Sequence, residues 1–104
     1  MSVSVSIIVP CYNVAAYLDQ CMESLAGQSM EDIEIICVND GSSDHTAEIL
    51  REWRDRDGRV RVIDRKNSGV SAARNSGMEE AAGKYIGFVD PDDVVERNMF
   101  RRLF

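Results

Sequence analysis

Three carboxylates lie within four residues near the end of the chain, in the segment Asp90-Pro91-Asp92-Asp93. Carboxylates packed this closely repel one another, so at neutral pH they hold a proton or attract a cation. Hard divalent cations such as Mg²⁺ and Mn²⁺ take oxygen ligands, usually one or two carboxylates together with the phosphates of a bound substrate. The same residues are also typical of an acidic turn, in which Asp93 could cap a helix beginning at Val94. The segment alone leaves a metal site and a turn as alternatives.

Two further groups of polar residues follow predicted strands earlier in the chain. Residues 10–13 follow an apolar strand over 3–9, and residues 39–44 follow another over 33–38. The acidic segment follows a third run, 85–89, whose aromatic and β-branched residues are typical of a buried strand. In a parallel sheet the carboxyl ends of all strands share one edge, where open α/β folds bind their ligands. We therefore predict that the three groups meet in one crevice.

The elements that would position these groups alternate between strand and helix. Pro10 is expected to end the first strand and Asn13 to cap the first helix, while Gly27 and Gly83 end helices. Helices are predicted over residues 14–26, about 44–56, 70–82 and from 94 onward, and a further short strand over 59–63. Repeated alternation with short connections favours an α/β fold with a mainly parallel sheet covered by helices on both faces.

Composition limits the classes of protein that need to be considered. With 104 residues, 44% of them hydrophobic and 29% charged, the chain is typical of one soluble globular domain. The formal charge of −6 disfavours nucleic acid and anionic lipid as partners. A diphosphate would need local help from a metal, an Arg or backbone amides. No apolar stretch approaches the roughly 20 residues of a membrane span, and the first residues lack the basic region of a signal peptide.

The cysteines Cys11, Cys21 and Cys37 are odd in number and widely spaced. They fit neither a disulfide framework nor a zinc site, and they indicate a reducing compartment such as the cytoplasm. We expect Cys37 to lie in the core and Cys21 to pack on a helix face.

The sequence contains three stretches that resemble the amino-terminal half of the family 2 inverting glycosyltransferases: PCYNVAAYLDQCMESLAGQ, DIEIICVNDGSSDHT and NSGVSAARNSGMEEAAGKYIGFVDPDD. These enzymes use nucleotide-diphospho-sugars and have the GT-A fold. The resemblance runs from about Ser4 to Asp93 and implies the Rossmann-like half of that fold. It further implies that residues 1–104 bind a nucleotide-diphospho-sugar, with a UDP-sugar expected, together with a divalent metal. The motifs do not indicate which sugar is used.

The resemblance implies a base-binding role for residues of the first two groups. Tyr12 would lie against the uracil ring, because an aromatic face supplies stacking area for a flat base. Pro10 and Asn13 would shape that pocket, and Asp40 would accept a hydrogen bond from the base N3–H. Without the resemblance, Tyr12 is interpreted as a half-buried surface aromatic and Asp40 as a turn residue before Gly41.

The resemblance also implies roles on the phosphate side. Arg74 would face the phosphates or brace the acidic loop through a charge-assisted hydrogen bond, although a solvated helix Arg fits as well. Gly69 would permit close backbone approach in its loop. The acidic segment resembles the family's D-x-D motif. By that likeness Asp90 would contact the ribose or a metal-bound water, Asp92 would be the main ligand of Mn²⁺ or Mg²⁺, and Asp93 a second. The metal would neutralise charge on the departing nucleoside diphosphate.

In the resembled family the acceptor site and the catalytic base lie well downstream of these motifs. Inverting transfer needs an Asp or Glu that deprotonates the acceptor hydroxyl on the face opposite the leaving group. Only 11 residues follow Asp93. We therefore expect the chain to be the nucleotide-binding portion of a longer enzyme, truncated at its carboxyl end and with no catalytic residue of its own. We interpret His45 as a first-turn helix residue rather than as a base.

Two functional interpretations remain open. The first is a donor-binding portion of a glycosyltransferase, whose full-length enzyme would act on a saccharide or lipid-linked saccharide, in the cytoplasm or at the cytoplasmic face of a membrane. The second is a non-catalytic α/β unit that self-associates as a homo-oligomer, because a truncated sheet leaves an unpaired edge and an uncovered apolar face. A phosphate-loop NTPase or a dinucleotide-binding domain is disfavoured, since neither GxxxxGK[ST] nor GxGxxG occurs.

Overall fold

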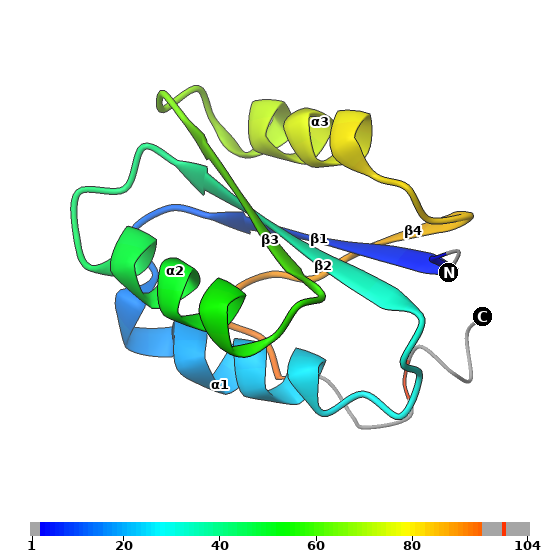
Figure 1. Cartoon of the computed structure of the whole chain (residues 1–104). Helices are drawn as coiled ribbons and strands as arrows, with labels where there is room; N and C mark the ends of the chain where they lie inside the picture. The colour runs from blue at the N-terminus through cyan, green and yellow to red at the C-terminus, as the bar shows by residue number, and fades with distance from the viewer. Residues whose placement is uncertain (1–2, 95–98, 100–104) are drawn as a thin grey trace.

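The computed structural model of the chain describes residues 3–94 and Met99 (Figure 1). The elements in chain order are β1 (Val5–Cys11), α1 (Ala15–Ala26), β2 (Ile33–Asp40), α2 (Thr46–Arg56), β3 (Val60–Arg65), α3 (Val70–Glu80) and β4 (Tyr85–Phe88). This order confirms the predicted alternation of strands and helices. The helix predicted from Val94 onward falls almost entirely outside the described residues.

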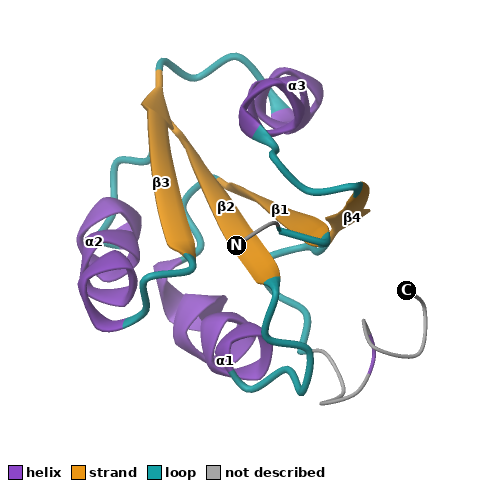
Figure 2. Cartoon of the chain, turned by 45° about the vertical axis from the view of Figure 1, so that its right-hand side comes forward, coloured by secondary structure: helices purple, strands orange, loops and turns teal. Residues whose placement is uncertain are grey.

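The strands form one parallel sheet in the order β3-β2-β1-β4. Helices α1 and α2 lie side by side on one face of this sheet, and α3 covers the other face (Figures 1 and 2). The structure therefore confirms a parallel sheet with helices on both faces, as in the Rossmann-like half of a GT-A fold. Within the described part of the chain, no helix is long and apolar enough to cross a lipid bilayer.

The core lies mainly between the sheet and the pair α1 and α2. Strands β1 and β2 occupy the centre of the sheet and are buried along their whole length, which explains their continuous apolar runs. The larger cluster takes from the two helices Leu18, Cys21, Met22, Leu25, Leu50 and Trp53. A smaller cluster under α3 consists of Ile8, Ile36, Val38 and Ala73. Burial of Cys37 in the core and of Cys21 on the inner face of α1 confirms both predictions.

Pro10 does not end the first strand, because β1 continues to Cys11. Ile8 accepts a hydrogen bond from Val89 on the β4 side, and alternation along the strand places the nitrogen of Pro10 on that same side. Pairing between β1 and β4 stops at Ile8, so no hydrogen bond of the sheet requires an N–H at Pro10 on this side. The partner on the other side is Val38 of β2, and pairing there is preserved.

Strand β2 also extends further than the apolar pattern predicted, through Asn39 to Asp40. These two polar residues pair with Asp64 and Arg65 at the end of β3, which is longer than expected for the same reason. The side-chain amide of Asn39 donates a hydrogen bond to Asp64 at 2.9 Å. Polar contacts between β2 and β3 thus extend the pairing of these strands beyond their apolar residues.

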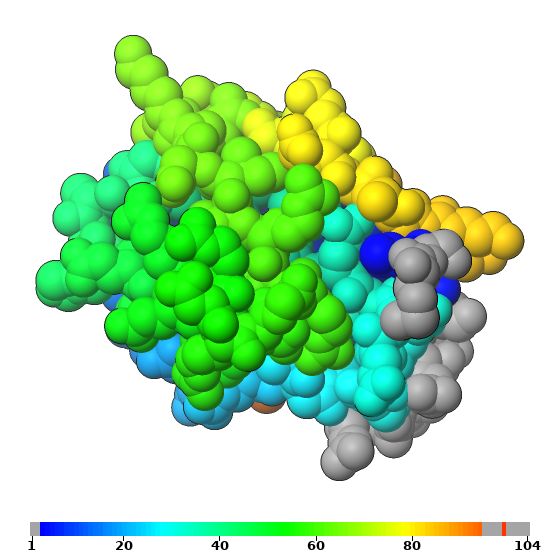
Figure 3. All heavy atoms as spheres, viewed as in Figure 1, coloured from blue at the N-terminus to red at the C-terminus, as the bar shows by residue number. Residues whose placement is uncertain are grey.

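Strand β4 is an exposed edge strand, and the prediction that it is buried is wrong. Tyr85, Ile86 and Phe88 are 46%, 39% and 46% exposed, whereas the following Val89 is buried at 4%. Within the described residues, β4 pairs with β1 alone and has no partner on its outer side. In Figure 3 the segment that leads from α3 into β4, coloured yellow to gold, projects at the side of the molecule. Its aromatic and β-branched composition therefore indicates a strand, but does not indicate whether that strand is buried.

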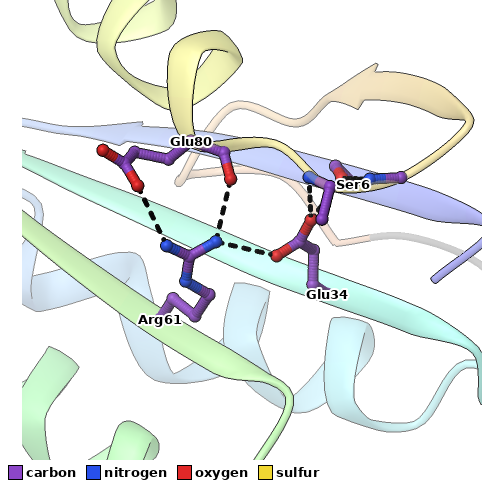
Figure 4. A network of polar contacts seen from close by, with 6 residues as sticks. Ser6, Glu34, Arg61 and Glu80 are labelled. Atoms are coloured by element: carbon purple, nitrogen blue, oxygen red, sulfur yellow. Dashed lines mark hydrogen bonds and ion pairs between the residues drawn. The ribbon is translucent and has the colours of Figure 1, made fainter. Parts of the chain in front are cut away.

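A polar network, here called the Glu34 clasp, joins β1, β2 and β3 to the end of α3, at the edge of the sheet where these strands begin (Figure 4). The Glu34 carboxylate accepts hydrogen bonds from the Ser6 hydroxyl and the Ala82 N–H, each at 2.6 Å. Arg61 donates to Glu34 at 3.1 Å, and also to the carbonyl and the carboxylate of Glu80. Because Ala82 donates to Glu34 and not to a helical carbonyl, α3 ends at Glu80 instead of the predicted residue 82.

Burial raises the pKa of Glu34, but the hydrogen bonds from Ser6, Ala82 and Arg61 lower this pKa by more. The net result is a pKa below the ordinary value for glutamate. Glu34 is thus a buried, ionised carboxylate with hydrogen bonds to both of its oxygens, as a stable buried charge requires.

Candidate functional site

A pocket of about 330 Å³ opens at the carboxyl ends of β1 and β2. Its lining comes from the end of β1 and the residue that follows it, the end of β2, the segment that joins β3 to α3, and the start of α3. The lining residues are Pro10, Cys11, Tyr12, Asp40, Asn67, Gly69, Val70 and Ala73. The structure thus brings four of the predicted site residues, Pro10, Tyr12, Asp40 and Gly69, around one pocket. Arg74 and the acidic segment are not among the lining residues, so the pocket contains only two of the three polar groups that were predicted to meet in one crevice.

Asp40 forms part of the pocket wall and is only 4% exposed. Its two carboxylate oxygens accept hydrogen bonds from the backbone N–H groups of Ser68 and Gly69, each at 2.9 Å. The Nε of Arg65 lies 3.6 Å from the same carboxylate. Next to it, Gly41 has a φ of 72°, and a Cβ there would lie 2.7 Å from the nitrogen of Asn67. Glycine therefore lets the end of β2 approach the loop that Asp40 holds.

Gly69 is required for a reason other than the predicted one. A Cβ on Gly69 would meet no atom of the described chain within 4 Å, so close approach inside the chain does not explain this glycine. Its φ is 99°, a left-handed conformation that favours glycine, and it directly precedes the first residue of α3. The glycine sets the bend through which the chain enters α3 beside the pocket.

Tyr12 lies at the rim of the pocket and is 51% exposed. A half-exposed aromatic ring on a pocket wall offers a flat apolar face to a ligand. Neighbouring Cys11 is buried, and its thiol donates to the carbonyl of Val9 at 3.4 Å. Burial raises the pKa of the Cys11 thiol, so this cysteine is neutral at physiological pH.

Asn13 does not cap α1, which corrects the sequence prediction, and it is not among the residues that line the pocket. The N–H groups at the start of α1 are satisfied by the β2–α2 loop instead. Val14 donates to the hydroxyl of Thr46 at 3.0 Å, and Ala15 donates to the carboxylate of Asp44 at 3.2 Å. The Asn13 side chain turns to that same loop, where its oxygen accepts the N–H of Asp44 at 3.3 Å.

The acidic segment forms a turn, and its carboxylates also converge. The N–H of Asp93 donates to the carbonyl of Asp90 at 3.0 Å, which closes the turn. One carboxylate oxygen each from Asp90, Asp92 and Asp93 lies within 4.8 Å of the others, and all three side chains are exposed. The two sequence interpretations are therefore compatible, since the turn itself gathers the oxygens. Hard oxygen donors at this spacing fit Mg²⁺ or Mn²⁺.

Two contacts attach the acidic turn to the rest of the fold. The guanidinium of Arg74 lies 3.6 Å from the carboxylate of Asp90 and 5.7 Å from the centre of the Phe88 ring. The contact with Asp90 is an ion pair that joins α3 to the acidic turn, and at 3.6 Å it is longer than the charge-assisted hydrogen bond that the sequence analysis expected of Arg74. Below the turn, the thiol of Cys21 donates to the carbonyl of Asp90 at 3.7 Å. Burial, with the nearby charges of the acidic turn, raises the pKa of Cys21 to about 12, so its sulfur remains protonated.

Four pocket residues were not predicted as site residues: Cys11, Asn67, Val70 and Ala73. Asn67 could have been found, because it stands in the Asn-Ser-Gly loop that follows β3 at the carboxyl edge of the sheet. Val70 and Ala73 carry no polar group, and their place in the wall follows only from how α3 packs. The pocket therefore combines one acidic wall with a partly apolar one.

A family model described as glycosyl transferase family 2 matches residues 6–104 of this chain. The uncharacterized glycosyltransferase EpsJ of Bacillus subtilis is 54% identical over 99 residues, which cover 95% of this chain and 29% of EpsJ. This chain thus spans less than a third of that curated relative.

Two solved structures have the same arrangement of elements. S. aureus TarS 1–349 in complex with UDP-GlcNAc matches with a TM-score of 0.90 and 31% identity, over 96% of this chain and 30% of the TarS 1–349 chain. The mannosyltransferase PcManGT from Pyrobaculum calidifontis, in complex with GDP-Man and Mn²⁺, matches with a TM-score of 0.83 over 90% of this chain and 29% of that protein. Because the identity is 22%, the match to PcManGT shows a shared fold alone.

Proposed function

This chain belongs to glycosyl transferase family 2, and from that membership we propose that it binds the nucleotide-diphospho-sugar donor, with UDP as the nucleotide. One observation carries the proposal: Tyr12, directly after β1, and Asp40, the last residue of β2, line a single pocket although they lie far apart in sequence. The volume of about 330 Å³ lies within the usual range for small-molecule sites, roughly 300–1,000 Å³. TarS, at 31% identity, forms a complex with UDP-GlcNAc.

The pocket offers the two kinds of contact that a uracil base needs. The exposed ring of Tyr12 supplies stacking area, and Pro10 shapes the wall beside it. Each oxygen of the Asp40 carboxylate accepts one backbone N–H, and an ionised carboxylate has further lone pairs available. Asp40 can therefore accept a hydrogen bond from the N3–H of uracil. Cytosine has an acceptor at N3, so the same carboxylate would repel it.

The acidic turn would hold the diphosphate through a divalent ion. Asp90 is held by Arg74, whereas no ion pair within the described residues involves Asp92 or Asp93, so these two carboxylates are the more available ligands. We assign Asp92 as the main ligand of Mn²⁺ or Mg²⁺, with Asp93 and Asp90 beside it. When bound, the ion neutralises charge on the departing nucleoside diphosphate. The role of the chain is to hold these carboxylates at one place and to orient them through Arg74.

The transfer step itself is proposed for the full-length protein, because this chain spans less than a third of its curated relative EpsJ. There, an Asp or Glu outside the sequence described here would deprotonate the acceptor hydroxyl, and the sugar would be transferred with inversion. The acceptor would be a saccharide or a lipid-linked saccharide, and the enzyme would act in the cytoplasm or at the cytoplasmic face of a membrane.

Calorimetry with UDP, in the presence and absence of Mn²⁺, tests the proposal. We expect binding that depends on Mn²⁺, and a preference for UDP over CDP of about tenfold or more, which corresponds to about 1.4 kcal/mol. Binding that ignores Mn²⁺ would contradict the metal assignment. Equal affinity for UDP and CDP would contradict the role of Asp40, and no binding by a well-folded sample would contradict the function.

A further inference from the structure

The loops that follow β1 and β2 are joined by hydrogen bonds in both directions. From the first loop, the side-chain oxygen of Asn13 accepts the N–H groups of Ser43 at 2.8 Å and Asp44 at 3.3 Å. The backbone N–H of Asn13 in turn donates to the hydroxyl of Ser42 at 3.1 Å. We call this set of contacts, together with those made by Asp44, the loop clamp.

Asp44 completes the loop clamp as a cap shared by two helices. One oxygen of its carboxylate accepts the N–H of Thr46 in α2 at 2.9 Å, and the other accepts the N–H of Ala15 in α1 at 3.2 Å. A carboxylate at the amino end of a helix is favoured by the helix dipole, and here two such ends meet. Burial raises the pKa of Asp44, but the hydrogen bonds from Thr46 and Ala15 lower it by more, so the net pKa is below the ordinary value for aspartate. The shared cap is therefore ionised at neutral pH.

The backbone at Asn13 shows that this position is specialised. Its φ is 51°, and Asn13 is the only residue other than glycine with a positive φ in the described chain. Asparagine tolerates this left-handed conformation better than most residues, and its side chain is short enough to bond locally. The bend falls directly after Tyr12, so it decides where the chain leaves the pocket rim and enters α1.

We propose that Asn13 and Asp44 are positioning residues that hold Tyr12 at the rim, opposite Asp40, for stacking on the base. The inference rests on the proposed function, because it assigns Tyr12 to the base. Tyr12 directly precedes Asn13, and Asp44 lies in the loop that begins after Asp40. The loop clamp therefore fixes the wall that contains Tyr12 relative to the wall that contains Asp40. Asn13 lies outside the pocket lining and therefore acts through Tyr12, without touching the ligand.

The variant Asn13→Gly separates this role from a general effect on folding. Glycine adopts the positive φ without strain, so the backbone bend is retained while the side-chain acceptor is lost. We expect its UDP affinity to fall about tenfold in calorimetry with Mn²⁺. Asp44→Asn should act in the same direction, because Thr46 and Ala15 donate to different carboxylate oxygens, and the amide replaces one of these acceptors with an NH₂ donor. Ser43→Ala is the matched control, since it keeps the backbone N–H that Asn13 accepts at 2.8 Å and removes only the longer contact from the Ser43 hydroxyl to the Asn13 oxygen at 3.4 Å. We expect its UDP affinity to stay within about twofold of the parent.

A double-mutant cycle with Tyr12→Ala gives the deciding measurement. If Asn13 acts through Tyr12, Asn13→Gly will cause no further loss of UDP affinity in the Tyr12→Ala background. An equal fold loss in both backgrounds would overturn the inference, and so would unchanged affinity of Asn13→Gly in the parent. Failure of the parent itself to bind UDP is a separate outcome, which contradicts the proposed function and removes the basis of the inference with it. Hydrogen exchange at the N–H groups of Ser43 and Asp44, measured without ligand, should accelerate in Asn13→Gly; unchanged exchange would show that the loop clamp does not hold the loop.

Discussion

The carboxylate of Asp40 accepts a hydrogen bond from the backbone N–H of Gly69 at 2.9 Å, across 29 residues of sequence. With the similar bond from Ser68, this contact joins the end of β2 to the start of α3 through one buried acid. The loop it holds carries Asn67, which lines the same pocket. Asp40 is thus both a structural acceptor and the carboxylate that we assign to the base, and substitutions there should affect stability and binding together.

Asp40→Asn tests this double role. The amide has one acceptor oxygen, so one of the N–H groups of Ser68 and Gly69 loses its partner in a buried place. We expect the free energy of unfolding to fall by about 1–3 kcal/mol, measured by urea denaturation, with a loss of the preference for UDP over CDP. Normal stability combined with a lost preference would show that the loop does not depend on Asp40.

Asp92→Asn should remove most of the Mn²⁺-dependent affinity for UDP while leaving the fold intact, because a carboxylate is lost from an exposed turn. Calorimetry with and without Mn²⁺ gives the affinity, and circular dichroism gives the fold. Asp55→Asn is the matched control, since it removes the same charge from an exposed position on α2. The metal assignment is wrong if the Asp92 variant binds UDP and Mn²⁺ like the parent.

The Glu34 clasp makes stability depend on acid pH. Its hydrogen bonds hold the pKa of Glu34 in the folded chain below the ordinary value of 4.5, so the unfolded chain binds this proton more tightly. The contribution is complete above pH 4.5 and is lost as the pH falls through that value toward the folded pKa. Glu34→Gln should be less stable at pH 7 by about 1–3 kcal/mol, with a flatter decline below pH 5. Parallel stability curves for variant and parent would contradict this account.

The open edge of β4 should promote self-association. Its outward backbone groups meet no strand among the described residues, and Tyr85, Ile86 and Phe88 leave apolar surface exposed. We expect the sedimentation coefficient to rise with protein concentration, and Ile86→Lys to weaken this rise. Met78→Lys is the matched control, since it adds a charge at an equally exposed apolar residue on α3. If the sedimentation coefficients of the two variants depend on concentration in the same way, any self-association does not involve the edge of β4.

The succession of elements and the place of the pocket could be predicted because both depend on local patterns. Apolar spacing in residues 15–26 and 46–56 fixes helices that bury one face, and the continuous apolar runs of β1 and β2 reflect a sheet covered on both sides. Once the strands are parallel, their carboxyl ends must share an edge. That geometry is sufficient to bring Tyr12 and Asp40 together without knowledge of a single contact.

The features that could not be predicted depend on partners distant in sequence. Asn13 has the position of a helix cap, yet α1 is capped by Asp44 and Thr46, which become neighbours only after β1 and β2 have paired. Strand β4 has the composition of a buried strand, and its exposure depends on what lies beside it. Strand β2 continues through polar residues because β3 offers matching polar groups.

The Glu34 clasp lies at the amino ends of the strands, whereas the pocket lies at their carboxyl ends. This separation means that the residues that anchor the amino ends of the sheet are not those that line the pocket, although Asp40, in the pocket wall, also holds the loop before α3. Substitutions at the pocket rim, such as at Tyr12 or Asn67, leave the anchor at the other end untouched. Residues of the rim could therefore be varied in a search for altered ligand preference while the residues of the Glu34 clasp are left unchanged.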